Sequence, residues 1–329
     1  MSIEVSKVNE IYEIPLQSII QLCGEDIGKK EYICHSLEKF FSSSKYEEWE
    51  EIYRNNIRID GEDVGRQYFR SVVIKSREDI IKILRISPKS MMRKYIEYQY
   101  INFEYQVIFE QISNMLDMIF MNFNLKFKNR FENLEVGYER NKMLDLLFSA
   151  EVYGDEEKTL ETLSNYELLS SFIELLREIQ RIDPHRTLII IKNIDHMISL
   201  REYQQLIKNI NNDLQDFENY WLFTSSIRNY VVVNEQNVEG ICVVNQDIYN
   251  FPDMEHIKSF VKENYPLEMN WEDKQVYKCI QGMVHKLGNE NEEINLQENV
   301  IFKMFQDTLC IKTVLCEEIN EIEMEYLRR

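Results

Sequence analysis

The sequence predicts an α/β fold with a degenerate P-loop-like, mostly parallel sheet as its head, an inserted α-helical leg domain and a helical C-terminal tail. Three observations predict it. Short apolar runs bounded by polar residues, such as 188–191, are typical of strands covered on both faces. These runs alternate along the chain with segments of helical periodicity. Only 9 glycines and 5 prolines occur in 329 residues, which favours helices over a turn-rich β fold.

The first strands and helices follow from local patterns. Residues 1–24 have the alternating polarity of strands, and apolar residues recur at helical spacing in 31–43. Residues 57–60 and 67–74 are predicted to pair as neighbouring strands across a turn. Ser76, with an acidic residue three positions later, predicts the start of a helix.

A helical leg is expected where residues 90–123 form a long amphipathic segment without glycine or proline. One helix of that length cannot bury its apolar face alone. Residues 165–182 have the pattern of a partner helix running in the opposite direction.

The sheet is expected to resume with strands at 188–191, 220–226 and 240–245, separated by helices at 199–214 and 253–265. The predicted domains are 1–88 (α/β head, first part), 89–182 (helical leg), 183–270 (α/β head, second part) and 271–329 (C-terminal helical extension).

Composition limits the class of protein. A formal net charge of −19 argues against coating of nucleic acid by the whole surface, but allows a local basic surface. No apolar run approaches the ~20 residues of a membrane span, and the first residues lack the apolar core of a signal peptide. The six cysteines contain no CxxC pair, so buried free thiols are expected. Together these features predict a cytoplasmic protein without a membrane partner.

A candidate phosphate-binding loop follows the strand at residues 19–23. A working GxxxxGK[ST] loop has four residues between its glycines, and a hydroxyl after its lysine to hold magnesium. Here only three residues, two of them acidic, separate Gly24 from Gly28, and Lys30 follows Lys29 in place of the hydroxyl. The predicted vestigial loop is therefore Gly24, Gly28 and Lys29.

The magnesium-holding acid expected at the end of a buried strand is also missing. After residues 188–191 that position is Asn193, and Asp195 lies two residues further on. These departures argue against nucleotide binding and ATP hydrolysis. The two glycines are then expected to form a tight strand-to-helix turn, with both lysines exposed at the helix start.

A local excess of positive charge marks residues 75–94, which contain seven lysines and arginines and two acids. Such a surface suits duplex phosphates, bound without sequence preference; the alternative is a solvated helix face. Lys82, Arg85 and Lys89 would share one face of a helix, although Pro88 interrupts the run. The candidate DNA-binding residues are Lys29, Lys30, Arg66, Arg70, Lys75, Arg77, Lys82, Arg85, Lys89, Arg93 and Lys94.

Acidic residues could hold a hard cation. Glu132, Glu135 and Glu139 have helical spacing, and calcium binds six to eight oxygens. Gly137 would break the helix that aligns them, so ordinary solvated acids are the alternative reading.

No catalytic constellation is present in the sequence. The five histidines lie apart, and no GxSxG, HExxH or paired-carboxylate nuclease motif occurs. Asp195 and His196 are adjacent, but neighbouring side chains on a strand or helix point apart. The sequence therefore predicts no catalytic residue and no enzyme.

The order of elements resembles the Csn-two family, the accessory adaptation proteins of type II-A CRISPR systems, in its longer form. The resemblance extends over residues 1–265 and rests on the segments 16–41, 188–210 and 243–253. The second of these, "LIIIKNIDHMISLREYQQLIKNI", is the most family-like.

This resemblance implies a degenerate nucleotidase-like head, a helical leg and no known catalysis. It implies a homotetrameric ring whose basic channel threads onto double-stranded DNA ends, with bound Ca²⁺ that stiffens the head and leg. It also implies the CRISPR integrase proteins and the effector nuclease as partners during spacer acquisition. Matched residue by residue, it gives Gly24, Gly28 and Lys29 as the loop relic and Asn193 as the vacated acid position.

Three functions stay open at this point. The first is the non-catalytic ring that binds double-stranded DNA ends, with no nucleotide expected. The second is a P-loop-type ATPase or nucleotide-binding protein that uses Lys29. The third is an adaptor that binds proteins alone.

Overall fold

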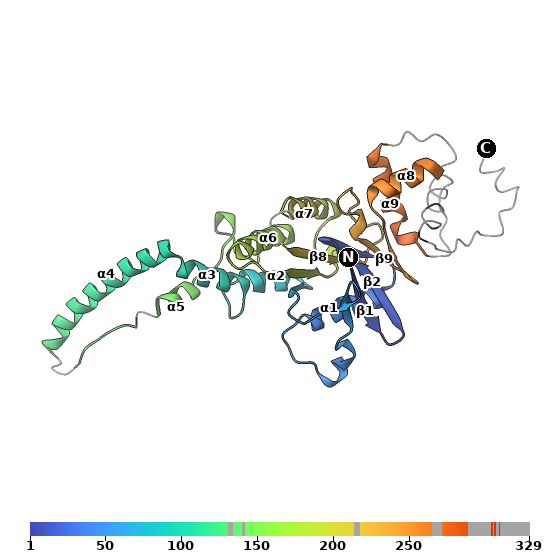
Figure 1. Cartoon of the computed structure of the whole chain (residues 1–329). Helices are drawn as coiled ribbons and strands as arrows, with labels where there is room; N and C mark the ends of the chain where they lie inside the picture. Colours follow the sequence, from blue (N-terminus) through green and yellow to red (C-terminus); the bar gives the residue numbers. More distant parts are fainter. Residues whose placement is uncertain are drawn as a thin grey trace. The chain divides into compact units, whose positions relative to one another are not determined.

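The chain forms two compact units, whose elements are labelled in Figure 1. The sheet unit comprises residues 1–73 and 186–329, and the helical unit comprises residues 74–185. The structure is a computed structural model. It describes residues 1–130, 134–139, 142–213, 218–264, 272–288, 304, 306 and 309.

A six-stranded sheet of order β10-β9-β3-β8-β7-β6 forms the centre of the sheet unit. β3, β7, β8 and β9 run parallel, and β10 pairs antiparallel with β9. The α/β fold with a mostly parallel sheet, predicted above, is confirmed. The strands are β3 (Ile19–Cys23), β6 (Arg70–Ile74), β7 (Thr187–Ile191), β8 (Asn219–Thr224), β9 (Ile241–Val244) and β10 (Ile248–Asn250).

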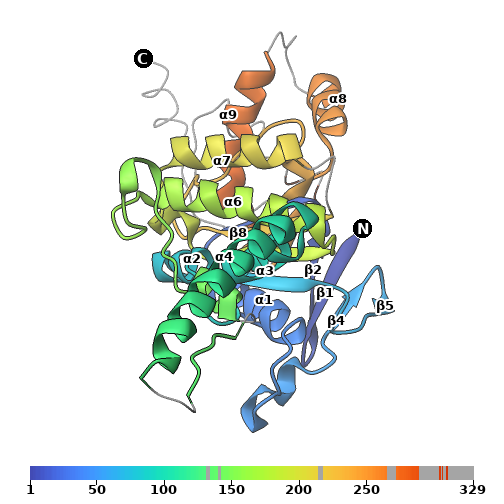
Figure 2. The same ribbon diagram turned by 90° about the vertical axis from the view of Figure 1, so that its left-hand side faces the viewer.

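Each face of this sheet is covered by helices, which explains why its central strands are almost wholly apolar. On one face, Ile33 and Leu37 of α1 share an apolar cluster with Ile190 and Leu222 of the sheet. On the other face, the ring of Tyr203 lies 5.2 Å from that of Phe223. Figure 2 shows α1 on one side of the sheet and α7 and α9 on the other. The helices are α1 (Ile27–Phe40), α7 (Leu200–Asp213), α8 (Met254–Asn264) and α9 (Asp273–Met283).

A second, antiparallel sheet of order β2-β1-β4-β5 packs into the same cluster as α1. Its strands are β1 (Ser2–Lys7), β2 (Glu10–Pro15), β4 (Ile57–Ile59) and β5 (Glu62–Asp63). The predicted pairing of 57–60 with 67–74 is wrong. β4 pairs with β1, where Ile57 lies opposite Val5, and β6 belongs to the large sheet. The buried faces of β1 and β4 match, and this partner lies about fifty residues away along the chain.

The helical unit contains α6 (Asn165–Ile182), a helix with the predicted bounds. Its start is a capping box: Ser164 accepts from Glu167 N–H, and Glu167 accepts from Ser164 N–H. The apolar face of α6 packs against α2 and α3. The other helices of the unit are α2 (Arg77–Leu84), α3 (Met91–Ile101), α4 (Phe103–Lys128) and α5 (Met143–Phe148).

The single long helix expected over 90–123 is two helices. Asn102 separates α3 from α4 with extended backbone angles, and its side chain accepts a hydrogen bond from Glu104 N–H at 3.2 Å. An asparagine side chain that satisfies backbone N–H groups starts a helix more readily than it continues one. α4 itself buries none of its residues.

The C-terminal extension contributes α9 and a 3-10 turn, Val284–Lys286, to the sheet unit. Most of the rest of 271–329 lies outside the described residues. Of the four described cysteines, Cys23, Cys34 and Cys242 are buried thiols without a disulfide, as expected, whereas Cys279 is only partly buried. Among the described helices, none is both long and apolar enough to cross a membrane.

Candidate functional site

The candidate site lies at the carboxyl ends of β3, β8 and β9. In open α/β sheets, ligands bind outside the carboxyl ends of the strands, where the order of connections reverses. β3 is such a point, because β8, β7 and β6 lie on one side of it and β9 on the other. The vestigial loop therefore stands where a phosphate would bind in a working site.

Gly24 makes the turn after β3 possible. Its φ of +97° lies in the left-handed region, which glycine adopts without strain. A β-carbon at this position would overlap the carbonyl oxygen of Val244 at the end of β9. A β-carbon at Gly28 would lie 3.4 Å from Asp26 Oδ1, an ordinary contact. The expected tight turn is confirmed, and Gly24 is the glycine that it requires.

The backbone N–H groups of the loop are bound by the chain itself. Glu25 N–H donates to Asn245 Oδ1 at 2.7 Å, and Asp26 N–H donates to Val244 O at 3.1 Å. Lys29 N–H donates to Asp26 Oδ1, the N-cap of α1, at 2.8 Å. In a working phosphate loop such N–H groups point at the phosphate oxygens. Here each of these three N–H groups donates instead to a carbonyl, amide or carboxylate oxygen of the chain.

Both lysines of the loop are turned inward. Lys29 donates from Nζ to Asn245 O at 3.2 Å and to Gln246 O. Lys30 is 4% exposed, and its ammonium donates to Gly24 O and Ser225 O, each at 2.7 Å. Burial lowers the Lys30 pKa. The expectation that both lysines are exposed is wrong, because the carbonyls at the sheet's carboxyl edge draw the ammonium groups in.

Asn193 occupies the predicted position of the missing acid. It has a φ of +50°, and its N–H donates to Thr224 Oγ1 at 2.8 Å. It follows β7 and lies beside the end of β8, as the sequence predicts for the residue after the buried strand. Its amide can neither carry charge nor hold magnesium as a carboxylate does.

Asp195 and His196 meet at Ser226, a residue that the sequence did not single out. Asp195 Oδ2 accepts from Ser226 Oγ at 2.6 Å and from the N–H groups of Ser226 and Ile227. His196 Nε2 lies 2.9 Å from the same hydroxyl. The expectation that the two side chains diverge is wrong, because they lie on a 3-10 turn, Ile194–His196, rather than on a strand or α-helix. Since the hydroxyl is bound to the carboxylate, the group anchors the loop after β8.

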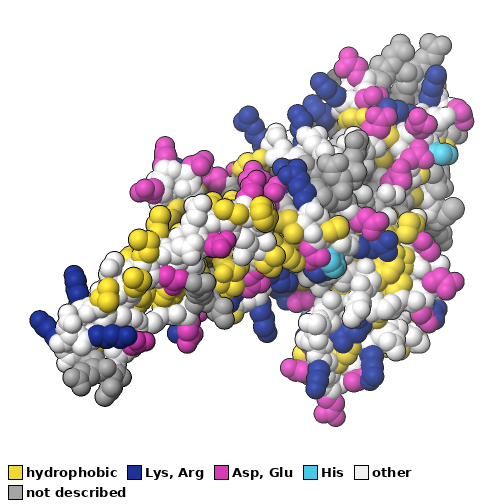
Figure 3. Space-filling view, turned by 60° about the vertical axis from the view of Figure 1, so that its left-hand side comes forward, with side chains coloured by type: hydrophobic (Ala, Val, Ile, Leu, Met, Phe, Trp, Pro, Cys, Tyr) yellow, Lys and Arg dark blue, Asp and Glu magenta, His cyan; other side chains and the backbone are white. Residues whose placement is uncertain are grey.

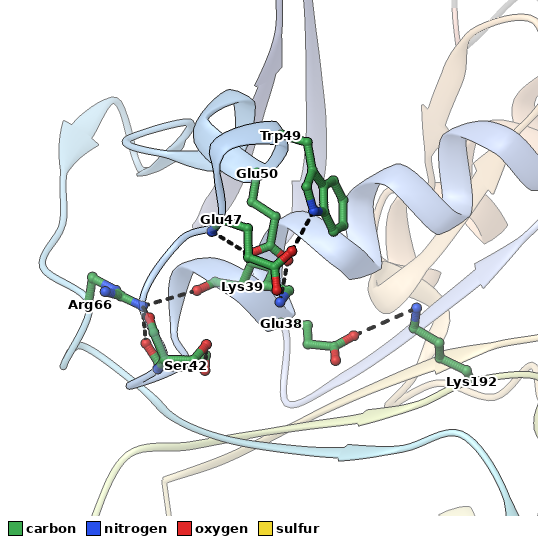
Figure 4. Close-up of polar contacts among 9 residues, drawn as sticks. Glu38, Lys39, Ser42, Glu47, Trp49, Glu50, Arg66 and Lys192 are labelled. Carbon is green, nitrogen blue, oxygen red and sulfur yellow. Dashed lines mark hydrogen bonds and ion pairs between the residues drawn. The ribbon is translucent and has the colours of Figure 1, made fainter.

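Arg66, a candidate DNA-binding residue, clamps the end of α1. Its guanidinium donates to Phe40 O at 3.1 Å and Ser44 O at 2.7 Å, and also to Lys39 O and Ser42 O. Carbonyls at a helix C-terminus lack partners inside the helix. Figure 4 shows Arg66 pointing at Ser42 beneath α1.

Lys192 was missed by sequence reasoning. Its ammonium lies 2.9 Å from Glu31 Oε2 and 3.9 Å from Glu38 Oε2, with the side chain only 7% exposed. Figure 4 shows its contact with Glu38. This ion pair joins a buried lysine after β7 to the half-exposed Glu31 of α1. No local pattern could have revealed it, because Glu31 lies 161 residues away along the chain.

Some basic residues of the helical unit are bound by hydrogen bonds or ion pairs within the unit, and others are exposed. Arg77 donates to Asn165 Oδ1 and to the carbonyls of Leu160, Glu161 and Leu163. These bonds join the start of α2 to the segment before α6. Arg77 therefore has a structural role in the fold.

Two further arginines are paired within the helical unit. Arg85 binds Glu161, and Arg93 lies 3.3 Å from Glu97 and over the ring of Phe148. Lys82, Lys89 and Lys94 are exposed, and Lys82 has only a 3.4 Å contact to Asp79. α2 ends at Leu84 and Lys89 has a φ of +68°, so the predicted single helix face is wrong. Arg70 and Lys75 are exposed in β6 and just after it.

The candidate calcium ligands do not form an oxygen cluster in the part of the chain that the structure describes. Glu132 lies outside the described residues. Glu135 pairs with Lys128 at 2.6 Å, and Glu139 pairs with Lys142 at 3.5 Å. Residues 134–139 are not helical. The described carboxylates therefore do not fit the six to eight oxygens that calcium takes, and among described residues no group of three or more His, Cys, Asp or Glu side chains could hold a metal.

Comparison with known proteins gives a structural relative. No protein-family model and no curated protein matches the sequence. Stu0660 of Streptococcus thermophilus has a TM-score of 0.81 at 18% identity, covering 99% of this chain and 100% of that chain. The Smc head domain of Pyrococcus furiosus with bound ScpA domain has a TM-score of 0.44 at 10% identity, covering 80% and 98%. The SMC head domain from Thermotoga maritima has a TM-score of 0.36 at 10% identity, covering 76% and 98%. The likeness to Stu0660 extends over the whole chain and shows a shared fold.

Proposed function

We propose that the chain is a long-form member of the Csn-two family, a non-catalytic ring protein that binds double-stranded DNA ends and supports CRISPR spacer acquisition in antiviral defence. The ring is a cytoplasmic homotetramer. Its partners are DNA ends, the CRISPR integrase proteins and the effector nuclease. The order of sequence elements and the full-length likeness to Stu0660 in fold support this proposal.

The engagement of the loop after β3 by its own chain carries the non-catalytic part of the proposal. A triphosphate would have to displace Asn245 from Glu25 N–H and the carbonyls from the ammonium groups of Lys29 and Lys30. Each hydrogen bond from a charged group contributes about 1.5–3 kcal/mol. The carboxylate of Asp26 would also repel the phosphates, whereas that of Glu25 is paired with Arg228 Nη2 at 2.6 Å.

The DNA-binding part rests on three of the exposed lysines of the helical unit, Lys82, Lys89 and Lys94. Three lysines are too few to hold a duplex on a chain of charge −19. When several copies face one channel, their fields add in a partly shielded space. A ring thus explains how an acidic chain holds DNA.

Calcium belongs to this proposal through the family resemblance alone. Of the three candidate ligands, the two described glutamates are neutralised by lysines. Calcium titration monitored by calorimetry tests it, with Glu135→Gln/Glu139→Gln as the variant. Loss of the binding heat in that variant would place the ion there.

Competition between linear and circular DNA tests threading. Labelled linear duplex is bound by the wild-type chain and challenged with unlabelled linear duplex, a closed circle of the same sequence, or a linear duplex with both ends blocked by a bulky protein. Threading predicts that only the open linear duplex competes well. Equal competition by all three would remove the ring-threading idea, and no binding of linear duplex would favour the protein adaptor.

Nucleotide binding tests the ATPase alternative. Filter binding of ATP with magnesium is compared between the wild-type chain and Lys29→Ala. We expect neither retention of ATP nor turnover in either protein. Magnesium-dependent turnover that Lys29→Ala abolishes would overturn the proposal in favour of a P-loop-type ATPase.

A further inference from the structure

The chain between α1 and β6 forms a pocket in the sheet unit. Its volume is about 410 Å³, within the range of small-molecule sites. The residues that line it are Lys45, Tyr46, Glu51, Arg54, Asn55 and Arg66. The vestigial loop lies at the N-terminus of α1, whereas Arg66 clamps the C-terminus of that helix. About 20 Å of helix therefore separates this pocket from the candidate site at the sheet edge.

The pocket has a local excess of positive charge. On the face drawn in Figure 3, basic side chains are scattered among acidic ones. The pocket lining instead has three cations and a single acid, Glu51, which lies 3.3 Å from Arg54 Nη1. Lys45 is exposed and has no ion pair or hydrogen bond among the described residues. Three cations less one acid leave the lining with a charge of +2, in a chain whose net charge is −19.

The other acids of this segment do not line the pocket. Glu47 accepts a hydrogen bond from Trp49 Nε1 at 2.6 Å, and it caps the 3-10 helix Glu48–Tyr53. Glu50 is 1% exposed and paired with Lys39. Glu48 is exposed outside the lining. The positive charge of the pocket is thus compensated within the lining by Glu51 alone.

Arg66 is held so that one of its nitrogens remains for a ligand. Nε and Nη2 donate to carbonyls at the end of α1, and the guanidinium carbon lies 4.7 Å from the centroid of the Tyr46 ring. Nη1 has no hydrogen bond within the described part of the chain. A guanidinium fixed in this way loses little side-chain freedom when Nη1 binds a ligand oxygen.

Arg54 and Tyr46 supply further donors. The Arg54 side chain is 62% exposed, and its surface ion pair with Glu51 contributes little, so a ligand of higher charge can compete for it. Tyr46 Oη is shielded from solvent, yet it has no hydrogen-bond partner among the described residues. Since buried hydroxyl groups normally have such a partner, a ligand oxygen that reaches Tyr46 Oη would supply it.

The charge and the donors of the lining indicate the class of ligand. A phosphate monoester has a charge of about −1.5 to −2 at neutral pH, which matches the lining. Its oxygens suit the fork of an arginine, and a lysine adds a point charge. A carboxylate or a phosphodiester has only one charge and would leave part of the lining uncompensated.

We propose that this pocket binds a phosphate monoester through Lys45, Arg54 and Arg66. The inference goes beyond the proposed function and does not depend on it. A free phosphate compound of the size of a mononucleotide and the 5′-phosphate of a nucleic acid end share this chemistry, and two kinds of probe distinguish them.

Calorimetric titration tests the pocket with inorganic phosphate, deoxyadenosine 5′-monophosphate and deoxyadenosine. We expect the two phosphate probes to saturate the wild-type chain at or below about 1 mM, and deoxyadenosine to give no binding heat. Lys45→Gln/Arg54→Gln should weaken the affinity for both phosphate probes by at least about tenfold, the contribution of one charged hydrogen bond. Both side chains are exposed, so the variant should fold.

Two controls show whether the pocket is responsible. Arg201→Gln/Lys208→Gln removes one arginine and one lysine exposed on α7, and Lys29→Ala changes the vestigial loop. Both controls should keep the wild-type affinity. The proposal is overturned by an equal loss in the α7 control, by a loss in Lys29→Ala, by an unchanged affinity in Lys45→Gln/Arg54→Gln, or by no saturation at about 10 mM phosphate.

Duplexes with 5′-phosphates or 5′-hydroxyls distinguish the two sources of the ligand. Tighter binding of the phosphorylated duplex, which Lys45→Gln/Arg54→Gln removes, would assign the pocket to DNA ends. Equal binding of the two duplexes, with saturation by the mononucleotide, would assign it to a free phosphate compound. If no duplex binds while the mononucleotide saturates the pocket, the pocket stands and the proposed DNA binding fails.

Discussion

Lys30, which stands where a working phosphate loop has its hydroxyl, has a structural role in this chain. Its ammonium is buried between the carbonyls of Gly24 and Ser225. Burial lowers its pKa below the ordinary value of 10.5, and the charge of Asp195 opposes that shift. A lysine whose ammonium joins two strand ends acts as a structural crosslink.

The pH dependence of stability should report on Lys30. The unfolded chain keeps this proton up to a pH of about 10.4, whereas the folded chain releases it at a lower pH. Between these two pKa values the unfolded state binds more protons, so the contribution of Lys30 to the free energy of unfolding rises with pH. Lys30→Met should lose this rise in urea unfolding measured from neutral pH upward. Lys82→Met, whose ammonium is exposed, should keep it; an identical pH profile for wild type and Lys30→Met would contradict the buried charge.

Alanine at Gly24 should be costly for two reasons that a second glycine separates. Gly24 and Gly61 both have a positive φ, but only at Gly24 would a β-carbon meet another atom, the Val244 oxygen. We expect Gly61→Ala to lower the free energy of unfolding by about 1 kcal/mol. Gly24→Ala should lower it by about 3 kcal/mol, since overlap adds to backbone strain. Chemical denaturation measures both, and equal losses would mean that the approach of β9 to the loop is not close.

At the scale of elements, local sequence signals were sufficient where nearby side chains satisfy the backbone groups of the element. The α6 start was predictable from its apolar periodicity, and Ser164 with Glu167 explains its position. The break at Asn102 was not predicted, because an asparagine is tolerated in a helix as well as at its start. The pairing of β4 could not be predicted either, since register is set by a partner strand distant in the sequence.

In the candidate site, too, features set by nearby residues could be predicted and features set by distant residues could not. Gly24 and the missing acid at Asn193 were readable from sequence spacing, and the structure places both at the carboxyl edge of the sheet. The inward turn of Lys29 was not readable, because its acceptors, Asn245 and Gln246, come from a loop more than two hundred residues later. Whether a cation is exposed or held depends on such distant partners.

Two cations of α2 should therefore respond differently to substitution. Arg77 donates hydrogen bonds to the segment before α6, whereas Lys82 is 73% exposed. Arg77→Met should lower the free energy of unfolding by about 2–4 kcal/mol, because partly buried carbonyls lose charged donors. Lys82→Met should change it by less than about 0.5 kcal/mol. Urea unfolding compares the two variants. A loss for Arg77→Met as small as that for Lys82→Met would show that the Arg77 hydrogen bonds do not stabilise the fold.

At the scale of the whole molecule, the proposed binding of DNA has to be reconciled with a chain of 57 acids and 38 lysines and arginines. Several of those cations hydrogen-bond to backbone carbonyls within the fold, as Lys30, Arg66 and Arg77 do. The proposed ring offers a solution, because three exposed lysines in each copy, at 82, 89 and 94, would become twelve in four copies. Binding must then depend on local charge rather than on net charge.

The salt dependence of DNA binding should distinguish local charge from net charge. Each phosphate that a lysine neutralises adds about 0.9 to the slope of log affinity against log salt concentration. Replacement of Lys82, Lys89 and Lys94 by glutamine should lower affinity for linear duplex and flatten that slope by about 0.9 for each phosphate that is no longer neutralised. A control with glutamine at the exposed Lys208, Lys274 and Lys278 of the sheet unit removes the same charge and should leave the slope unchanged. Light scattering of both variants shows that the assembly is intact, so that a weaker slope reports on DNA binding. If the two variants lose affinity equally, total charge governs binding, and the proposed lysines do not line the DNA path.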